Sequence, residues 1–164
     1  MRGRAPAGQR LRPPSHPAAY ENKRYSVTLM TTLSLASGFV YSHPREDSNS
    51  SLDFLAFIVD LIIAGHIRAG DIVILDNASV HWSADNEDAL MFLFNTAGAR
   101  LVFLPPYSPE LNPAELLFNM AKSWLKRNGG QKPLLFEIIE AFAQISATFV
   151  LRSYLHSIWS EFYG

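Results

Sequence analysis

Two carboxylates stand at positions where an α/β fold would make them functional. Asp76 directly follows the apolar run 72–75, and Glu115 follows Asn112-Pro113, a pair typical of a helix start. Functional side chains gather in loops at the carboxyl ends of strands, because the sheet holds these loops rigid. Two fixed carboxylates offer the oxygen ligands that hard cations such as Mg²⁺ require. The sequence therefore makes Asp76 and Glu115 candidate catalytic residues and metal ligands.

Each of these two acids also has a purely structural interpretation. Asp76-Asn77 is common turn chemistry between a strand and a helix. Asn112 followed three residues later by Glu115 fits a capping box, in which two side chains satisfy helix-end amides without any metal. His81 either orients a ligand, contacts phosphate or makes a local hydrogen bond. Asn77, His81 and Asn112 are therefore supporting candidates, and the spacing alone leaves both interpretations open.

The remaining motifs and the composition exclude several function classes. Ser79 and His81 lack the Gly-x-Ser-x-Gly elbow of serine hydrolases, and no glycine-rich phosphate loop occurs. The absence of cysteine excludes disulfides and thiolate-zinc sites. A net charge of -1 gives no overall attraction to nucleic acid, so such affinity must come from local patches. One basic patch lies at the N-terminus, in Arg2, Arg4, Arg10 and Arg12.

The distribution of apolar residues favours a globular protein without membrane segments. The composition is 48% hydrophobic and 18% charged, as in proteins with a packed core. The N-terminus is basic but has no apolar run behind it, unlike a signal peptide. The most apolar window, 54–64, is too short to span a bilayer and contains Asp60. We therefore expect a soluble protein with no membrane partner.

The expected domain organisation is a basic Pro/Gly-rich arm over 1–20 and one partial α/β domain over 21–164. The expected strands are 25–34 and 39–42, an antiparallel pair, followed by 72–75 and 101–104. The expected helices are 52–65, capped by Ser50 or Ser51, then 85–96 ended by Gly98, 113–128, a long helix over 135–149 and a shorter one up to 162. Continuous apolar runs at 72–75 and 101–104 predict parallel strands buried on both faces.

Two motifs taken together resemble a known family. The stretches L-D-N-A-S-V-H at 75–81 and L-P-P-Y-S-P-E-L-N-P-A-E at 104–115 closely resemble the catalytic half of mariner-like DNA transposases and related bacterial insertion-sequence transposases. The resemblance implies a ribonuclease H-like mixed sheet with flanking helices. It also implies three acids that bind two divalent metals, with Asp76 as the second acid and Glu115 as the third. Phe118 and Lys122 match the family's spacing after the third acid and favour Glu115 over Glu110.

The resemblance also places the family's first acid upstream of this sequence. Residues 4–10 are similar to the segment that follows the first catalytic strand in the family, so that strand is expected before Met1. It is the central strand of a ribonuclease H-like sheet, and without it 25–34 and 72–75 should face a gap or pair out of order. The family's helix-turn-helix region is missing as well. We therefore expect an N-terminally truncated domain that is inactive or nearly so.

The resemblance implies an activity and partners, and one alternative stays open. It implies DNA strand cleavage and transfer with Mg²⁺ or Mn²⁺, two ions in the complete enzyme, on transposon ends and target DNA. A homodimer is possible, and the compartment would be the nucleus in a eukaryote and the cytoplasm otherwise. The alternative is a non-catalytic nucleic-acid-binding or assembly module that uses the arm on phosphates, and a decayed gene copy is a third interpretation.

Overall fold

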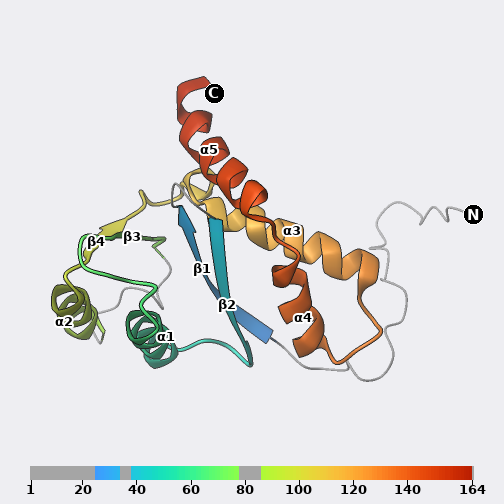
Figure 1. Cartoon of the computed structure of the whole chain (residues 1–164), viewed down its shortest axis with the longest axis horizontal. Helices are drawn as coiled ribbons and strands as arrows, with labels where there is room; N and C mark the ends of the chain where they lie inside the picture. Colours follow the sequence, from blue (N-terminus) through green and yellow to red (C-terminus); the bar gives the residue numbers. More distant parts are fainter. Residues whose placement is uncertain (1–24, 34–37, 78–85, 164) are drawn as a thin grey trace, which may run out of the picture.

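The chain is a mixed α/β protein (Figure 1). The computed structural model describes residues 25–33, 38–77 and 86–163, so the predicted arm over 1–20 and His81 lie outside the described residues. The strands are β1 (Tyr25–Leu33), β2 (Gly38–Glu46), β3 (Ile72–Leu75) and β4 (Arg100–Phe103). The helices are α1 (Ser51–Ile63), α2 (Glu87–Ala97), the short η2 (Pro109–Leu111), α3 (Pro113–Asn128), α4 (Leu134–Ala143) and α5 (Ala147–Tyr163).

The four described strands form two separate two-stranded sheets. β1 and β2 are antiparallel, with a register that runs from Tyr25 opposite Glu46 to Leu33 opposite Gly38. β3 and β4 are parallel, as the β-α-β pattern predicts, and lie to one side of the first pair in Figure 1. No ladder joins β1 to β3 among these described strands, and the additional strand expected between them stays a prediction.

Strand β2 is longer than the sequence indicates. The prediction that this strand ends at 42 is wrong, because β2 continues to Glu46 and places Pro44 opposite Val27. Proline cannot donate to a ladder, so it normally ends or excludes a strand. It is tolerated here because β1 is the only described strand that pairs with β2, which makes β2 an edge strand.

The two faces of the β1–β2 sheet contact two different hydrophobic cores. Met30 and Tyr41 lie opposite each other in the register and pack against the first core, which includes residues of α1, α2 and β3. Leu29 and Val40 pack on the opposite face, against the second core built from α3 and α4. Because side chains alternate along a strand, one pair of strands serves both cores. The buried residues of the first core are Phe54, Phe57, Ile58, Leu61, Ile67, Leu75, Leu90, Phe94 and Ala99, and those of the second are Ala121, Ile138, Ala141 and Phe142.

Helix α1 is fixed at its start and along one face. Ser50 and Asp53 form a reciprocal capping box, which confirms Ser50 as the cap. Asp53 also makes an ion pair with Arg45 of β2. Further along, the ring of Phe57 lies 5.7 Å from that of Tyr41 between centroids. These contacts join α1 to the β1–β2 sheet.

Within the described part of the chain, the parallel pair β3–β4 is covered on one face only. Leu75 is buried against α1 and α2, whereas Ile72, Ile74 and Val102 are 59%, 55% and 40% exposed. The prediction that these strands are buried on both faces is therefore wrong for the described residues. A continuous apolar run indicates that a strand can be buried on both faces, but it does not supply the second layer.

The C-terminal segment forms two helices where the apolar spacing predicts one long helix over 135–149. The chain leaves α4 after Ala143, and the N–H of Phe149 donates to Ser146 Oγ at 3.2 Å, a cap that starts α5. Within the described ranges no single helix is long and apolar enough to cross a membrane, and α4 and α5 pass on length and composition only together, as a pair bent by 78°.

A buried carboxylate closes the turn between α3 and α4. Glu137 is 2% exposed, and its Oε1 accepts the backbone N–H groups of Gly130, Gln131 and Lys132 at 2.8 to 2.9 Å. Its charge is thus compensated by oriented amides at the N-terminal end of α4. The same helix carries Glu140 near the surface, where it pairs with Lys132.

We predict that Glu137→Ala lowers the free energy of unfolding by about 2–3 kcal/mol, because three amides lose a charged acceptor. Glu137→Gln should cost only about 1 kcal/mol, because a carbonyl oxygen can replace Oε1. Urea unfolding measures both values. The control Glu140→Ala should change stability by less than about 1 kcal/mol, as expected of a surface pair. Equal losses in the Glu137 and Glu140 variants would contradict this assignment.

A hydrogen bond from α5 holds the C-terminal helix on the sheet. The hydroxyl of Tyr154 donates to the carbonyl of Thr31 in β1 at 2.9 Å. Burial raises the pKa of Tyr154 above its ordinary value of 10.0. The native state therefore favours the protonated hydroxyl, the form that can donate.

We predict that Tyr154→Phe costs about 1 kcal/mol of stability at neutral pH, because the Thr31 carbonyl loses its donor. The native pKa is raised, so this contribution is complete below pH 10 and is lost as the pH rises through the native value. The difference in unfolding free energy between wild type and variant should therefore shrink above pH 10. A difference that stays constant to higher pH would show that Tyr154 does not titrate with folding.

Candidate functional site

Asp76 is positioned by the end of the parallel ladder. It directly follows β3, and the N–H of Leu104 donates to the carbonyl of Leu75 at 2.8 Å, so the pairing continues past β4. The side-chain amide of Asn77 then donates to the carbonyl of Leu104. These bonds join the chain after β3 to the chain after β4 and fix the direction in which Asp76 leaves the sheet.

Glu115 is positioned by the first turn of α3. Asn112 is the N-cap, and its Oδ1 accepts the N–H of Ala114 at 3.1 Å. A capping box would also require Glu115 to accept the N–H of Asn112, but that N–H donates to the carbonyl of Pro109 at 3.0 Å. The capping-box interpretation of Glu115 is therefore wrong. The Glu115 side chain is exposed and does not cap its own helix.

Helix α3 is anchored by its buried and partly buried apolar residues. Leu117 is fully buried, and the ring of Phe118 meets that of Phe142 edge to face at 5.8 Å between centroids. Phe118, which the family resemblance singles out, therefore packs against α4. Lys122 is exposed on the same helix.

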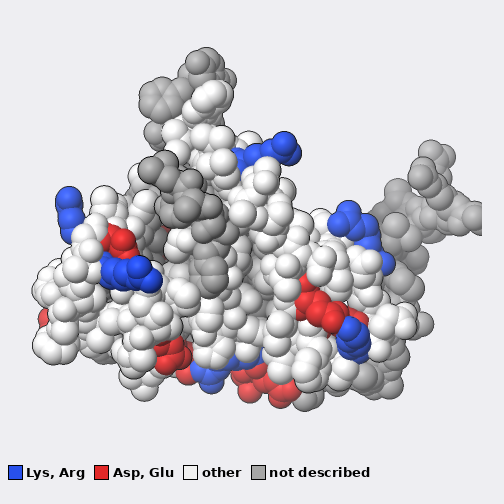
Figure 2. Space-filling model, viewed as in Figure 1, with Lys and Arg blue, Asp and Glu red and all other residues white. Residues whose placement is uncertain are grey.

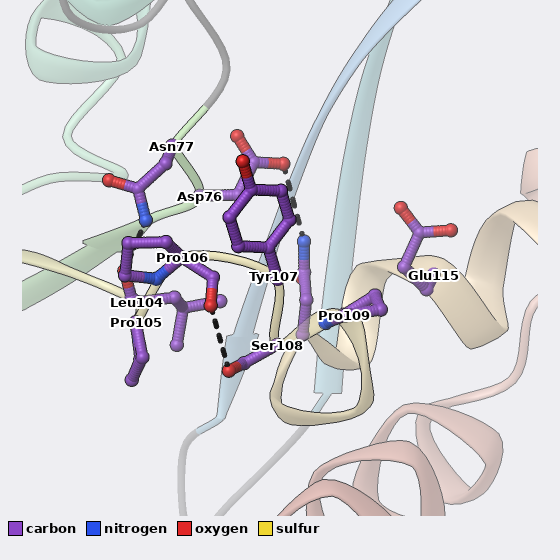
Figure 3. A pocket seen from close by; sticks show the side chains of 10 residues that line it. Asp76, Asn77, Leu104, Pro105, Pro106, Tyr107, Ser108, Pro109 and Glu115 are labelled. Carbon is purple, nitrogen blue, oxygen red and sulfur yellow. Dashed lines mark hydrogen bonds between the residues drawn. The ribbon is translucent and has the colours of Figure 1, made fainter.

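Asp76 and Glu115 line one pocket of about 400 Å³. In Figure 3 the two carboxylates extend to the same side of the loop, Asp76 from the end of β3 and Glu115 from α3. Asn112 lies between these elements, and its Nδ2 makes a long contact of 3.5 Å with Asp76 Oδ2. The structure thus brings together four of the five predicted site residues, Asp76, Asn77, Asn112 and Glu115. His81 lies outside the described residues.

The donor set of this pocket fits a hard divalent cation. Its lining includes two carboxylates and two side-chain amides, but neither histidine nor cysteine. Oxygen ligands of this kind suit Mg²⁺ or Mn²⁺ better than zinc. In the described part of the chain no group of three or more His, Asp or Glu side chains is arranged to hold a metal. The described lining therefore supplies two carboxylates and two amides, donors that suit such a cation.

The sequence analysis did not identify the loop residues that shape the pocket. Tyr107, Ser108 and Pro109 line it together with the acids. Tyr107 is completely exposed and has a φ of 60°, in the left-handed region that residues other than glycine rarely adopt. The proline-rich stretch 104–109 could have indicated them, because it predicts a loop between two rigid elements, and such loops often carry functional residues.

Charged side chains do not form one basic surface on the face shown in Figure 2. There Lys and Arg residues are interspersed with Asp and Glu. This arrangement agrees with the net charge of -1 and with the inference that nucleic-acid affinity must come from local groups.

Comparison with known proteins gives a family and distant structural similarities. A chain in the "CryoEM structure of simian T-cell lymphotropic virus intasome in complex with PP2A regulatory subunit B56 gamma" is similar to this chain with 12% identity and a TM-score of 0.47. The similarity covers 74% of this chain and 47% of that one, so the chain spans about half the length of this relative. No curated protein matches the sequence significantly. The family of DDE superfamily endonucleases matches residues 1–132, and the chain therefore belongs to the DDE superfamily endonucleases.

Proposed function

We propose that this chain forms the catalytic domain of a mariner-like DNA transposase, in which Asp76 and Glu115 are two of the metal-binding acids. The observation that carries the proposal is their meeting at one pocket, although 38 residues separate them in the sequence. The family match and the motifs at 75–81 and 104–115 support the same conclusion. The substrate would be transposon-end and target DNA, in the nucleus of a eukaryotic host or the cytoplasm of a bacterial one.

Each side chain has a definite part in the proposed chemistry. Asp76 and Glu115 would hold Mg²⁺ or Mn²⁺ by their carboxylate oxygens, and the end of β3 and the first turn of α3 position the two residues. Asn112 would orient Asp76 while it caps α3. When bound, the two metals would activate a water or a DNA 3′-hydroxyl and stabilise the leaving oxygen. A DNA phosphate entering the pocket would also lie near the positive end of the α3 dipole.

We further propose that the complete sheet is ribonuclease H-like, with one more strand between β1 and β3. Two-stranded sheets are only marginally stable alone, and a strand in this position would join both pairs into one mixed sheet. It would also bring its carboxyl end close to Asp76, where a third acid would complete the metal site. With two acids among the described residues that line the pocket, we expect the chain to nick DNA weakly or not at all.

The metal site is tested by Mn²⁺ binding measured calorimetrically on the whole chain. Asp76→Asn and Glu115→Gln should each weaken Mn²⁺ binding by about tenfold or more, because each removes a charged ligand. The matched control is Glu110→Gln, which changes an exposed acid of η2 that does not line the pocket. Its affinity should equal that of the wild type. Equal Mn²⁺ affinities for the Glu110, Glu115 and Asp76 variants would contradict the proposal.

The orienting role of Asn112 is tested by separating its two contacts. Serine is as good an N-cap as asparagine but is too short to reach Asp76, so Asn112→Ser should keep the unfolding free energy within about 0.5 kcal/mol of the wild type. Its Mn²⁺ affinity should nevertheless fall by about tenfold. Asn112→Ala should in addition lose about 1 kcal/mol of stability. Unchanged Mn²⁺ binding in Asn112→Ser would show that Asn112 only caps the helix.

A non-catalytic DNA-binding or assembly module is the second candidate, favoured by the lack of a third ligand among the described residues. It predicts that Asp76→Asn and Glu115→Gln bind DNA as tightly as the wild type, with or without Mn²⁺. Removing the charges of Arg2, Arg4, Arg10 and Arg12 should then weaken DNA binding and flatten its salt dependence. The transposase proposal instead predicts that Mn²⁺ strengthens DNA binding and that the two acid variants lose this effect.

A further inference from the structure

We propose that Tyr107 forms a nucleobase-binding subsite at the rim of the Asp76–Glu115 pocket, where an unpaired DNA base stacks on its ring. The inference rests on the proposed function, because it requires DNA to approach this pocket. It adds a recognition element that neither the two acids nor the family match provides. Figure 3 shows Tyr107 projecting from the loop that links β4 to α3.

The first observation is the exposure of the aromatic ring. Tyr107 is 101% exposed, whereas Ile63, the next most exposed large hydrophobic side chain among the described residues, is 80% exposed. The ring therefore contributes nothing to either core. An aromatic ring that is kept in water beside a pocket has its whole face available to a ligand.

The second observation is the backbone conformation of the same residue. Tyr107 has a φ of 60°, which is unfavourable for a residue with a Cβ atom. Such strain persists only where the surroundings hold it, and it concentrates at functional sites. Strain and exposure at one residue together indicate that the loop is built to present this ring.

The loop has the contacts that hold Tyr107 in place. Pro106 precedes it and accepts a hydrogen bond from Ser108 Oγ at 3.4 Å. Downstream, the N–H of Leu111 donates to the carbonyl of Ser108 at 3.2 Å and closes η2. Prolines at 105, 106 and 109 restrict the backbone further, because each fixes its own φ. The ring is therefore presented by a rigid support, which lowers the entropy cost of binding.

The chemistry of the site identifies the ligand as an unpaired base. Inside a duplex the base planes are stacked on each other, so away from the duplex ends the ring can stack only on a base that is unpaired or turned out. Stacking of bases on aromatic side chains tolerates any sequence and needs no positive charge. It therefore suits a pocket whose own side-chain charges are two carboxylates. The stacked base would fix the neighbouring phosphate beside Asp76 and Glu115.

The test is a coupling experiment with the whole chain and fluorescent duplexes that carry a short single-stranded overhang, in Mn²⁺ buffer. One abasic site is placed at each overhang position in turn, and affinities are measured by anisotropy. Tyr107→Ala should weaken binding to the intact overhang by about 5- to 100-fold, and Tyr107→Phe should bind like the wild type. At one position the abasic site should weaken the wild type by a similar factor and Tyr107→Ala no further. The control Phe92→Ala removes another exposed aromatic, in α2, and should leave affinity unchanged.

A glycine variant separates binding from stability. Tyr107→Gly relieves the positive φ, so its unfolding midpoint should rise above that of Tyr107→Ala, while its DNA affinity falls as far as in the alanine variant. Independent losses from Tyr107→Ala and the abasic site at every position would overturn the inference. An equal loss in Tyr107→Phe would also overturn it, because the hydroxyl rather than the ring face would then make the contact.

Failure of the inference is distinguishable from failure of the proposed function. Mn²⁺ binding by Tyr107→Ala should equal that of the wild type, because the tyrosine is not a metal ligand. Mn²⁺ binding that depends on Asp76 and Glu115, without coupling at any base, would refute the stacking subsite and leave the metal site standing. Coupling at one base with no effect of the acids on Mn²⁺ would refute the metal site and support a base-binding subsite.

Discussion

The antiparallel ladder between β1 and β2 is the interaction on which the rest of the structure depends. Its side chains alternate, so Met30 and Tyr41 pack against α1 while Leu29 and Val40 pack against the core of α3 and α4. A shift of one strand by one residue would move its side chains to the opposite face of the sheet, where they would meet the other core. The nine-residue ladder therefore fixes how the two cores lie relative to each other.

The two acids that line the pocket belong to segments that pack in different cores, so the arrangement of the cores sets their relative position. Asp76 follows β3, which packs with α1 and α2, whereas Glu115 belongs to α3, whose buried face joins α4. The loop from β4 through η2 crosses between them, and Asn112 contacts Asp76 while it caps α3. Any change in the packing of one core relative to the other would thus alter the separation of the acids. The pocket thus lies between elements of the two cores.

Local chemistry explains which elements the sequence predicted well and which it did not. Ser50 caps α1 and Gly98 ends α2 with a φ of 70°, because caps depend on side chains next to the helix end. The sequence analysis missed the extension of β2 through Pro44, because a strand tolerates proline only where the proline nitrogen faces an unpaired edge. The break between α4 and α5 was missed because apolar spacing continues across it, although Ser146 starts a new helix. Whether the second face of β3–β4 is buried depends on whether another element packs against it, and the local sequence does not indicate this.

The sequence by itself determined the candidate acids, their amide neighbours and the elements that carry them, because strand ends and helix starts are encoded within a few residues. The tertiary structure decided that Asp76 and Glu115 share a pocket, since that requires packing between segments distant in the chain. It also excluded the capping box at Glu115, because the N–H of Asn112 donates to the carbonyl of Pro109 instead. The left-handed backbone conformation and full exposure of Tyr107 likewise depend on the conformation of the surrounding loop, which the sequence does not show. Local interactions thus determine which residues are candidates, and long-range packing determines which of them lie in the same pocket.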